Sequence, residues 1–308
     1  AAATAAGATN YLDTSGVSAT KMTIEGTADT DIGAVKVGTT SFDASGASGA
    51  ITASLTNASD SGLATIKTGS GDDSVTLDLN DLTATATVAL GDGADTLTVS
   101  STATETFQPT MSGAETIDVT DIANATTATI SLTNTTGLET VVAGSAAGTN
   151  NFGTGTLALV NASGDLAINT AGESGAGTIS TDTSGAVTVT VADDADSKAI
   201  TAGGDDASAG IFIADKAGSV TLNVTGNIDQ TGNVSADKAT SVTVTTSAFT
   251  QSDIDIDAAK AETVTITAAG TAAFNASSDF SGAKVLTVDS TKTTTVGDLA
   301  SLKTADIS

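Results

Sequence analysis

Two turns rich in glycine and aspartate are the residues of this chain whose types and spacing could bind a metal ion. They read Gly69-Ser70-Gly71-Asp72-Asp73-Ser74-Val75 and Gly91-Asp92-Gly93-Ala94-Asp95-Thr96-Leu97. Glycine permits a left-handed backbone that points carbonyl groups into a turn. Ca²⁺ prefers carboxylate and carbonyl oxygens as ligands. The chemistry that these residues predict is therefore calcium binding.

The two turns are in phase, because the interval from Asp73 to Asp95 is also the interval at which strands farther along the chain repeat. If one coil of the fold spans this interval, the turns stack at the same corner of neighbouring coils. One Ca²⁺ would then lie between them, held by Asp73, Asp95 and turn carbonyls, with Asp72 or Asp92 as a candidate additional ligand. The turns themselves would be shaped by Gly69, Gly71, Gly91 and Gly93. The alternative is that these are ordinary Gly-Asp turns that bind nothing.

The elements that position these turns follow from an internal repeat of about 22 residues, a period typical of solenoid proteins. Val220, Val242, Val264 and Leu286 follow one another at this interval, each within an alternation of apolar residues and threonine. Such alternation places successive side chains on opposite faces of a strand. A single strand cannot bury its apolar face alone, but stacked copies can. The wider interval from Val187 to Val220 indicates an insertion, which we place in the acidic stretch 193–210.

We therefore expect an all-β fold, a right-handed parallel β-helix or β-solenoid with coils of about 22 residues. The alternative is a series of tandem β-sandwich domains, in which turns recur about every 8–12 residues and a buried tryptophan or tyrosine is common. This chain has no tryptophan and a single tyrosine, which favours the solenoid. Residues 1–60 keep the repeat less well and are expected to form a cap or a small β module. Residues 61–308 are expected to form the solenoid.

Composition excludes several classes of function. Ten lysines and no arginine stand against 36 acidic residues, for a net charge of −26. Nucleic acid and anionic membranes attract clustered basic residues, so neither is an expected partner. No apolar run is long enough to insert into a membrane. Histidine and cysteine are absent, so nucleophilic triads are excluded. We expect no catalytic activity.

The two turns resemble the calcium-binding nonapeptide of RTX proteins, in which glycines and an aspartate precede an apolar residue. Both lack the first glycine, where Thr68 and Leu90 stand. Together with coils such as Ala261-Glu262-Thr263-Val264 and Ala239-Thr240-Ser241-Val242, they make roughly residues 60–290 similar to RTX-type S-layer proteins of Gram-negative bacteria. The resemblance is specific in composition and turns but loose in sequence. RTX copies are few, and no secretion or anchoring segment is recognisable.

That resemblance implies export by type I secretion, calcium-dependent folding, and self-assembly into a lattice outside the cell. The expected partner is the chain itself, with cell-surface polysaccharide as a second candidate. The expected location is the extracellular cell surface. A secreted calcium-dependent adhesin, or a protein of a biofilm matrix or filament, shares fold, calcium and export, and is the alternative function.

Overall fold

The structure is a computed structural model of the 308-residue chain. It describes residues 9–12, 19–35, 38–55, 62–123, 125–143, 155–170, 178–191, 211–225, 233–247, 251–274, 278–296 and 299–308. The chain divides into an N-terminal unit, residues 1–120 and 128–141, and a C-terminal unit, residues 121–127 and 142–308.

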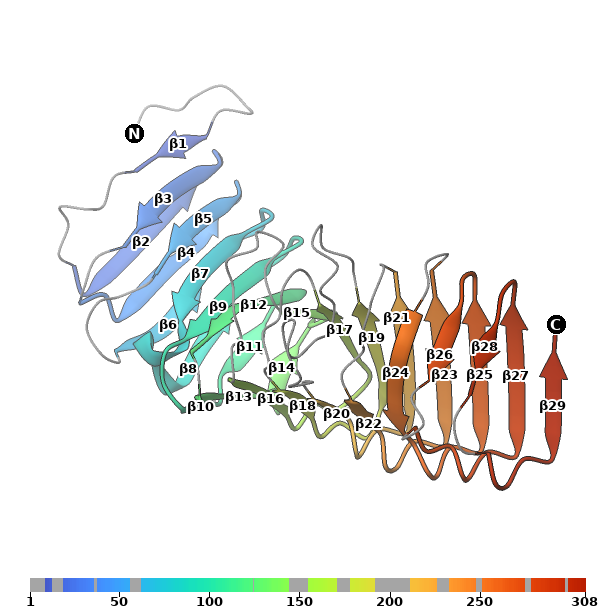
Figure 1. Cartoon of the computed structure of the whole chain (residues 1–308). Helices are drawn as coiled ribbons and strands as arrows, with labels where there is room; N and C mark the ends of the chain where they lie inside the picture. The colour runs from blue at the N-terminus through green and yellow to red at the C-terminus, as the bar shows by residue number, and fades with distance from the viewer. Residues whose placement is uncertain are drawn as a thin grey trace. The chain divides into compact units, whose positions relative to one another are not determined.

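The N-terminal unit is built from parallel sheets whose strands alternate along the chain (Figure 1). Its sheet N1 contains β1 (Asn10–Tyr11), β3 (Thr30–Ala34), β5 (Ile51–Ser54), β7 (Ser74–Asp78), β9 (Thr96–Ser101) and β12 (Thr116–Ile122). Its sheet N2 contains β2 (Lys21–Gly26), β4 (Ser41–Ala47), β6 (Leu63–Lys67), β8 (Leu82–Ala89), β11 (Thr110–Ser112) and β14 (Asn134–Thr136). A third sheet contains the paired strands β10 (Glu105–Phe107) and β13 (Thr127–Ser131). A short 3-10 helix, η1 (Leu79–Asp81), precedes β8.

The C-terminal unit repeats a simpler coil made of two sheets. Strand β15 (Thr140–Ala143) crosses the boundary between the units, as do β12 and β13 at their ends. Sheet C1 contains β17 (Leu166–Thr170), β19 (Ala186–Val191), β21 (Ser219–Val224), β23 (Ser241–Thr246), β25 (Thr263–Ala268), β27 (Val285–Ser290) and β29 (Thr304–Ile307). Sheet C2 contains β16 (Thr156–Val160), β18 (Thr178–Thr181), β20 (Ile211–Ile213), β22 (Asn233–Ser235), β24 (Gln251–Asp257), β26 (Ala272–Phe274) and β28 (Thr294–Thr295).

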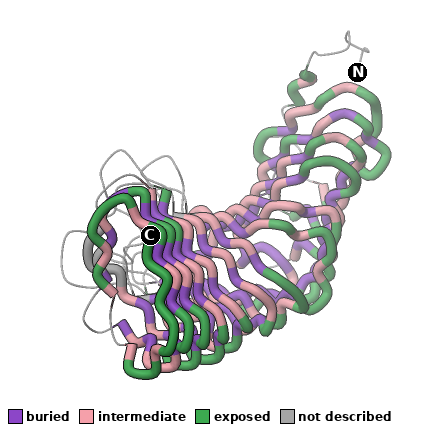
Figure 2. The backbone as a smooth tube through the Cα atoms, turned by 90° about the vertical axis from the view of Figure 1, so that its right-hand side faces the viewer, coloured by how far each residue is buried: buried purple, intermediate pink, exposed green. Residues whose placement is uncertain are grey.

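The core of the C-terminal unit is a set of apolar columns. Val220 pairs with Val242, Val242 with Val264, and Val264 with Leu286 in parallel register. These four side chains are at most 4% exposed. Stripes of equally buried residues run from coil to coil in Figure 2. The alternation of apolar residues and threonine therefore does set this register, as predicted.

The outward positions of four C1 strands form three further columns, which we call the hydroxyl face. They are Ala186, Ser219, Ser241 and Thr263; Thr188, Thr221, Thr243 and Thr265; and Thr190, Asn223, Thr245 and Thr267. All twelve side chains are half-buried or exposed. None of the twelve is charged, although the chain carries 36 acidic residues and ten lysines.

The predicted parallel β-solenoid with coils of about 22 residues is confirmed. Every strand pair of the described residues is parallel, whereas the sheets of β-sandwich domains are antiparallel, so the alternative fold is excluded. Val187 pairs with Val220, so the longer interval between them still closes one coil. The insertion predicted at 193–210 lies outside the described residues. The boundary predicted at residue 60 stays a prediction.

The described residues contain no α-helix. Accordingly, none of them forms a helix with the length and apolar character needed to span a bilayer.

Candidate metal centre

The two predicted turns lie one above the other at a corner of the N-terminal unit. Asp73 directly precedes β7 and Asp95 directly precedes β9. Ser74 pairs with Thr96 in parallel register, so the residues before them occupy equivalent places in successive coils. The predicted stacking of the turns is therefore present in the structure.

The carboxylates at this corner accept hydrogen bonds from the backbone of the neighbouring coil. Asp73 Oδ1 accepts from the Ile51 N–H of the preceding coil at 2.7 Å, and its Oδ2 accepts from the Gly69 N–H of its own turn at 3.2 Å. Asp95 Oδ1 accepts from the Asp73 N–H at 2.8 Å. Ile51 begins β5 and Asp73 directly precedes β7, so two of these bonds are made at the starts of strands. Each buried carboxylate thus links its own coil to the coil before it.

Glu115 continues this column, and we did not predict it. Its Oε2 accepts a hydrogen bond from the Asp95 N–H at 2.8 Å. The signal was present in the sequence as a glycine, any residue, an acid, Ser or Thr, and an apolar residue. That pattern occurs at Gly71–Val75, Gly93–Leu97, Gly113–Ile117 and Gly137–Val141. The comparison with the nonapeptide drew attention to the aspartates and passed over the glutamate.

Burial makes this corner electrostatically costly. Asp73 is 2% exposed and Asp95 is 1% exposed. Loss of hydration raises the pKa of Asp73 above its ordinary value. It raises the pKa of Asp95 to about 6, and the negative charges of Asp73 and Glu115 add to that shift. Among the described residues, Asp95 Oδ2 is a buried oxygen without a hydrogen-bond partner.

The glycines of the turns are required by the close approach of successive coils. A Cβ on Gly69 would lie 1.8 Å from the carbonyl oxygen of Ala47, and one on Gly91 would lie 1.8 Å from that of Gly69. Gly91 and Gly93 also have positive φ angles of 98° and 143°, whereas Gly69 and Gly71 do not have positive φ angles, so the prediction of a left-handed backbone is wrong for the first turn. The second turn therefore has the left-handed backbone that its sequence predicts.

The donor atoms around Gly93 suit a hard cation such as Ca²⁺. A Cβ on Gly93 would lie 2.4 Å from the Gly71 carbonyl oxygen and 3.0 Å from Asp95 Oδ1, so both oxygens lie close to this glycine. Asp95 Oδ2 is the orphaned carboxylate oxygen beside it. The described residues contain no group of three acidic side chains arranged to hold a metal ion. Any calcium here would take most of its ligands from backbone carbonyls and water.

The remaining predicted ligands are exposed. Asp72 Oδ1 accepts a hydrogen bond from the Ala94 N–H at 3.0 Å, which again links two coils. Asp92 lies on the surface of the second turn. The buried pair Asp73 and Asp95 therefore forms the centre of the candidate site, and Asp72 and Asp92 lie at its rim.

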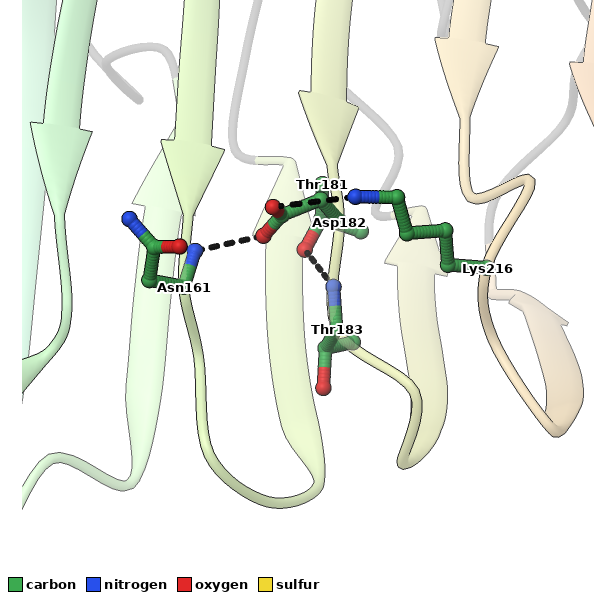
Figure 3. A network of polar contacts seen from close by, with 5 residues as sticks. All are labelled: Asn161, Thr181, Asp182, Thr183 and Lys216. Atoms are coloured by element: carbon green, nitrogen blue, oxygen red, sulfur yellow. Dashed lines mark hydrogen bonds and ion pairs between the residues drawn. The ribbon is translucent and has the colours of Figure 1, made fainter.

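Acidic residues also link coils in the C-terminal unit, as Figure 3 shows for Asp182. Its Oδ1 accepts from the Asn161 N–H at 2.5 Å, and its Oδ2 lies 3.3 Å from Lys216 Nζ. Nearby, the Thr183 N–H donates to Thr181 Oγ1 at 3.3 Å. Here a lysine balances the carboxylate, whereas no lysine contributes to the pKa of Asp73 or Asp95.

A hollow beside the ends of β19, β21 and β23 is lined by polar but non-ionisable side chains. It has a volume of about 330 Å³ and is lined by Thr190, Asn223, Val224, Thr225, Thr245, Thr246 and Ser247. These side chains carry hydroxyl groups, one amide and one alkyl group. None of them titrates near neutral pH, so none could act as a general acid or base there.

Comparison with protein-family models, with curated proteins and with solved structures gave no match. The strand topology alone classifies this chain as a parallel β-solenoid.

Proposed function

We propose that this chain is a non-catalytic structural protein that assembles with copies of itself, in the presence of calcium, into a layer on the cell surface. The observation that carries the proposal is the acidic corner formed by the buried Asp73 and Asp95 and the half-buried Glu115. Three carboxylates occupy successive coils, and the central one keeps an oxygen without a partner. The resemblance to RTX-type S-layer proteins supports the same conclusion.

The carboxylates of this corner link neighbouring coils by hydrogen bonds. Its carboxylates hold backbone amides of adjacent coils, and they exist as a cluster only when the coils are stacked. Two nearly unexposed carboxylates one coil apart repel each other strongly, because the surrounding medium screens them poorly. A bound Ca²⁺ supplies positive charge and accepts oxygen ligands. Binding that requires the stacked state adds its free energy to folding.

Calcium would also reduce the self-repulsion of the whole chain. A net charge of −26 opposes both compaction and contact between copies. Calcium outside the cell is abundant enough to fill weak sites, with dissociation constants in the range of about 10⁻⁴–10⁻³ M. We therefore infer that the chain functions outside the cell and assembles there.

The experiment is electron microscopy of the purified chain in millimolar Ca²⁺, with Mg²⁺ at equal concentration as the control and with a chelator added afterwards. A two-dimensional array that forms with Ca²⁺ and disperses on chelation is expected. Isolated particles would favour the adhesin, and long threads would favour a matrix filament. Arrays that form equally well in Mg²⁺ or in chelator would contradict the role of calcium.

A further inference from the structure

The turns that lead from sheet C2 to sheet C1 have the same backbone hydrogen bond in four successive coils. In each turn the N–H of the fourth residue donates to the carbonyl of the first, at 2.9–3.0 Å. These bonds join Ala217 to Ala214, Ala239 to Ala236, Ala261 to Ala258 and Ala283 to Phe280. The strands that follow the turns pair in parallel register. Equivalent turn residues therefore stack from coil to coil at the spacing of neighbouring strands, about 4.8 Å.

These four coils carry an ordered set of charges at this corner of the C-terminal unit. In each of them an aspartate comes before a lysine along the chain, so the aspartates lie nearer sheet C2 and the lysines nearer sheet C1. The four pairs, which we call the Asp-Lys corner, are Asp215 and Lys216, Asp237 and Lys238, Asp257 and Lys260, and Asp279 and Lys284. The other described lysines are Lys21, Lys67, Lys292 and Lys303. Half of the described lysines therefore belong to this one corner.

Two lysines of the Asp-Lys corner form no ion pair within the chain. Lys216 pairs with Asp182 of the preceding coil (Figure 3), and Lys284 pairs with Glu262. Neither of these described ion pairs includes Lys238 or Lys260, and both of these side chains are exposed.

Like charges are neighbours in both columns of the corner. Close approach of the Lys238 side chain lowers the pKa of Lys260, and the charge of Asp237 has a smaller, opposite effect. On the acidic side, Asp257 and Asp279 are partners in a parallel bridge. Opposite charges supplied from outside the chain would relieve the repulsion in both columns.

A negative column beside a positive one is complementary to a copy of itself. If two copies are related by a two-fold axis parallel to the stack of coils, each aspartate faces a lysine of the same coil in the partner, and each lysine faces an aspartate. A two-fold axis across the coils would instead set aspartate against aspartate. A polyanion would meet the aspartates as well as the lysines, so the pattern suits it less. We propose that the Asp-Lys corners of two copies face each other, with their C-terminal units side by side and pointing in the same direction.

This contact is expected to be weak by itself. Exposed ion pairs contribute little individually and are screened by salt. The contact would therefore not hold a dimer at low concentration, and it would act where many copies are arrayed and several contacts are made together. The inference rests on the proposed self-assembly, to which it adds the surface used and the relative direction of the copies.

The first test reverses the sign of one column. Lys238→Glu with Lys260→Glu would set acidic groups against acidic groups, so we expect it to raise the protein concentration needed for assembly in Ca²⁺ by about tenfold or more. The matched control is Lys21→Glu with Lys292→Glu, which makes the same change of charge at two exposed lysines outside the corner. The control should assemble at a concentration close to that of the wild-type chain. Melting in chelator should show that all three proteins are equally folded.

The second test exchanges the signs of both columns in two coils, with Asp237→Lys, Lys238→Asp, Asp257→Lys and Lys260→Asp in one chain. This variant keeps the net charge of the wild type, and its two columns still face opposite charges when two such copies meet. It should therefore assemble with itself at about the wild-type concentration. In a mixture with the wild type it should segregate, because like charges meet in every mixed contact. Energy transfer between differently labelled chains measures the segregation.

The outcomes separate this inference from the proposed function. If Lys238→Glu with Lys260→Glu assembles like the wild type, or if the exchanged and wild-type chains mix freely, the inference is wrong while the proposed function stands. A wild-type chain that stays monomeric in Ca²⁺ contradicts both. Binding of polygalacturonate by wild-type monomers, lost in the doubly substituted lysine variant, would assign the corner to an acidic polymer instead of a second copy.

Discussion

At the scale of single residues, each buried carboxylate of the acidic corner accepts backbone hydrogen bonds and also adds a negative charge to the interior. Asp73 and Asp95 accept hydrogen bonds from backbone N–H groups. These bonds favour the ionised forms of the two carboxylates. Their burial has the opposite effect and is the larger influence, so the pKa values of both rise. The corner is therefore well bonded but electrostatically unfavourable, and an added proton or cation relieves the repulsion.

A pH dependence follows from Asp95. Its pKa of about 6 in the folded chain lies above its ordinary value of 3.8. Between about pH 4 and pH 6 the folded chain then binds more protons than the unfolded chain, so the free energy of unfolding falls as pH rises through that window. Urea unfolding in chelator should show the wild-type chain losing stability relative to Asp95→Asn over this range. A difference between the two proteins that is constant from pH 4 to pH 7 would contradict the assignment.

At the scale of elements, each strand buries one face against the coils on either side. The inner columns are apolar and almost completely buried, and the outer columns are short polar side chains. A core of this width is filled by valine, leucine and isoleucine and has no space for an unpaired polar group. A one-residue slip of any strand would exchange the two faces. The strand register is therefore fixed by burial.

Val242 tests this register. Its side chain is 0% exposed and lies between Val220 and Val264. Val242→Asp should lower the free energy of unfolding by about 3–5 kcal/mol, because it buries an unpaired carboxylate. Thr243→Asp, one residue along and on the outer side, should change it by less than about 1 kcal/mol. Thermal melting compares them, and similar melting temperatures for the two variants would be incompatible with the register.

At the scale of the whole molecule, the net charge of −26 influences which molecules and ions the chain can contact. Its acidity disfavours contact with nucleic acid and with other copies, and it attracts cations. We propose calcium as the cation for the corner, since the atoms close to Gly93 are oxygens. The proposed structural role depends on neutralising part of this charge.

The double variant Asp73→Ala with Asp95→Ala tests the link between calcium and stability. We expect millimolar Ca²⁺ to raise the melting temperature of the wild-type chain and to raise that of the variant much less, because binding to the stacked corner adds to folding. The control is Asp289→Ala with Asp306→Ala, because these two substitutions of exposed aspartates remove the same amount of charge. A variant that keeps the full calcium response would place the binding elsewhere, as would a control that loses it.

The sequence by itself determined the coil, the register and the place of the acidic turns. It could do so because strand alternation and a constant repeat are local patterns, and stacking carries one coil's pattern to the next. It did not reveal Glu115 as part of the corner, nor the orphaned Asp95 oxygen, nor the steric need for Gly69. Those depend on distances between atoms that belong to different coils and lie far apart in the chain, and no local pattern contains them.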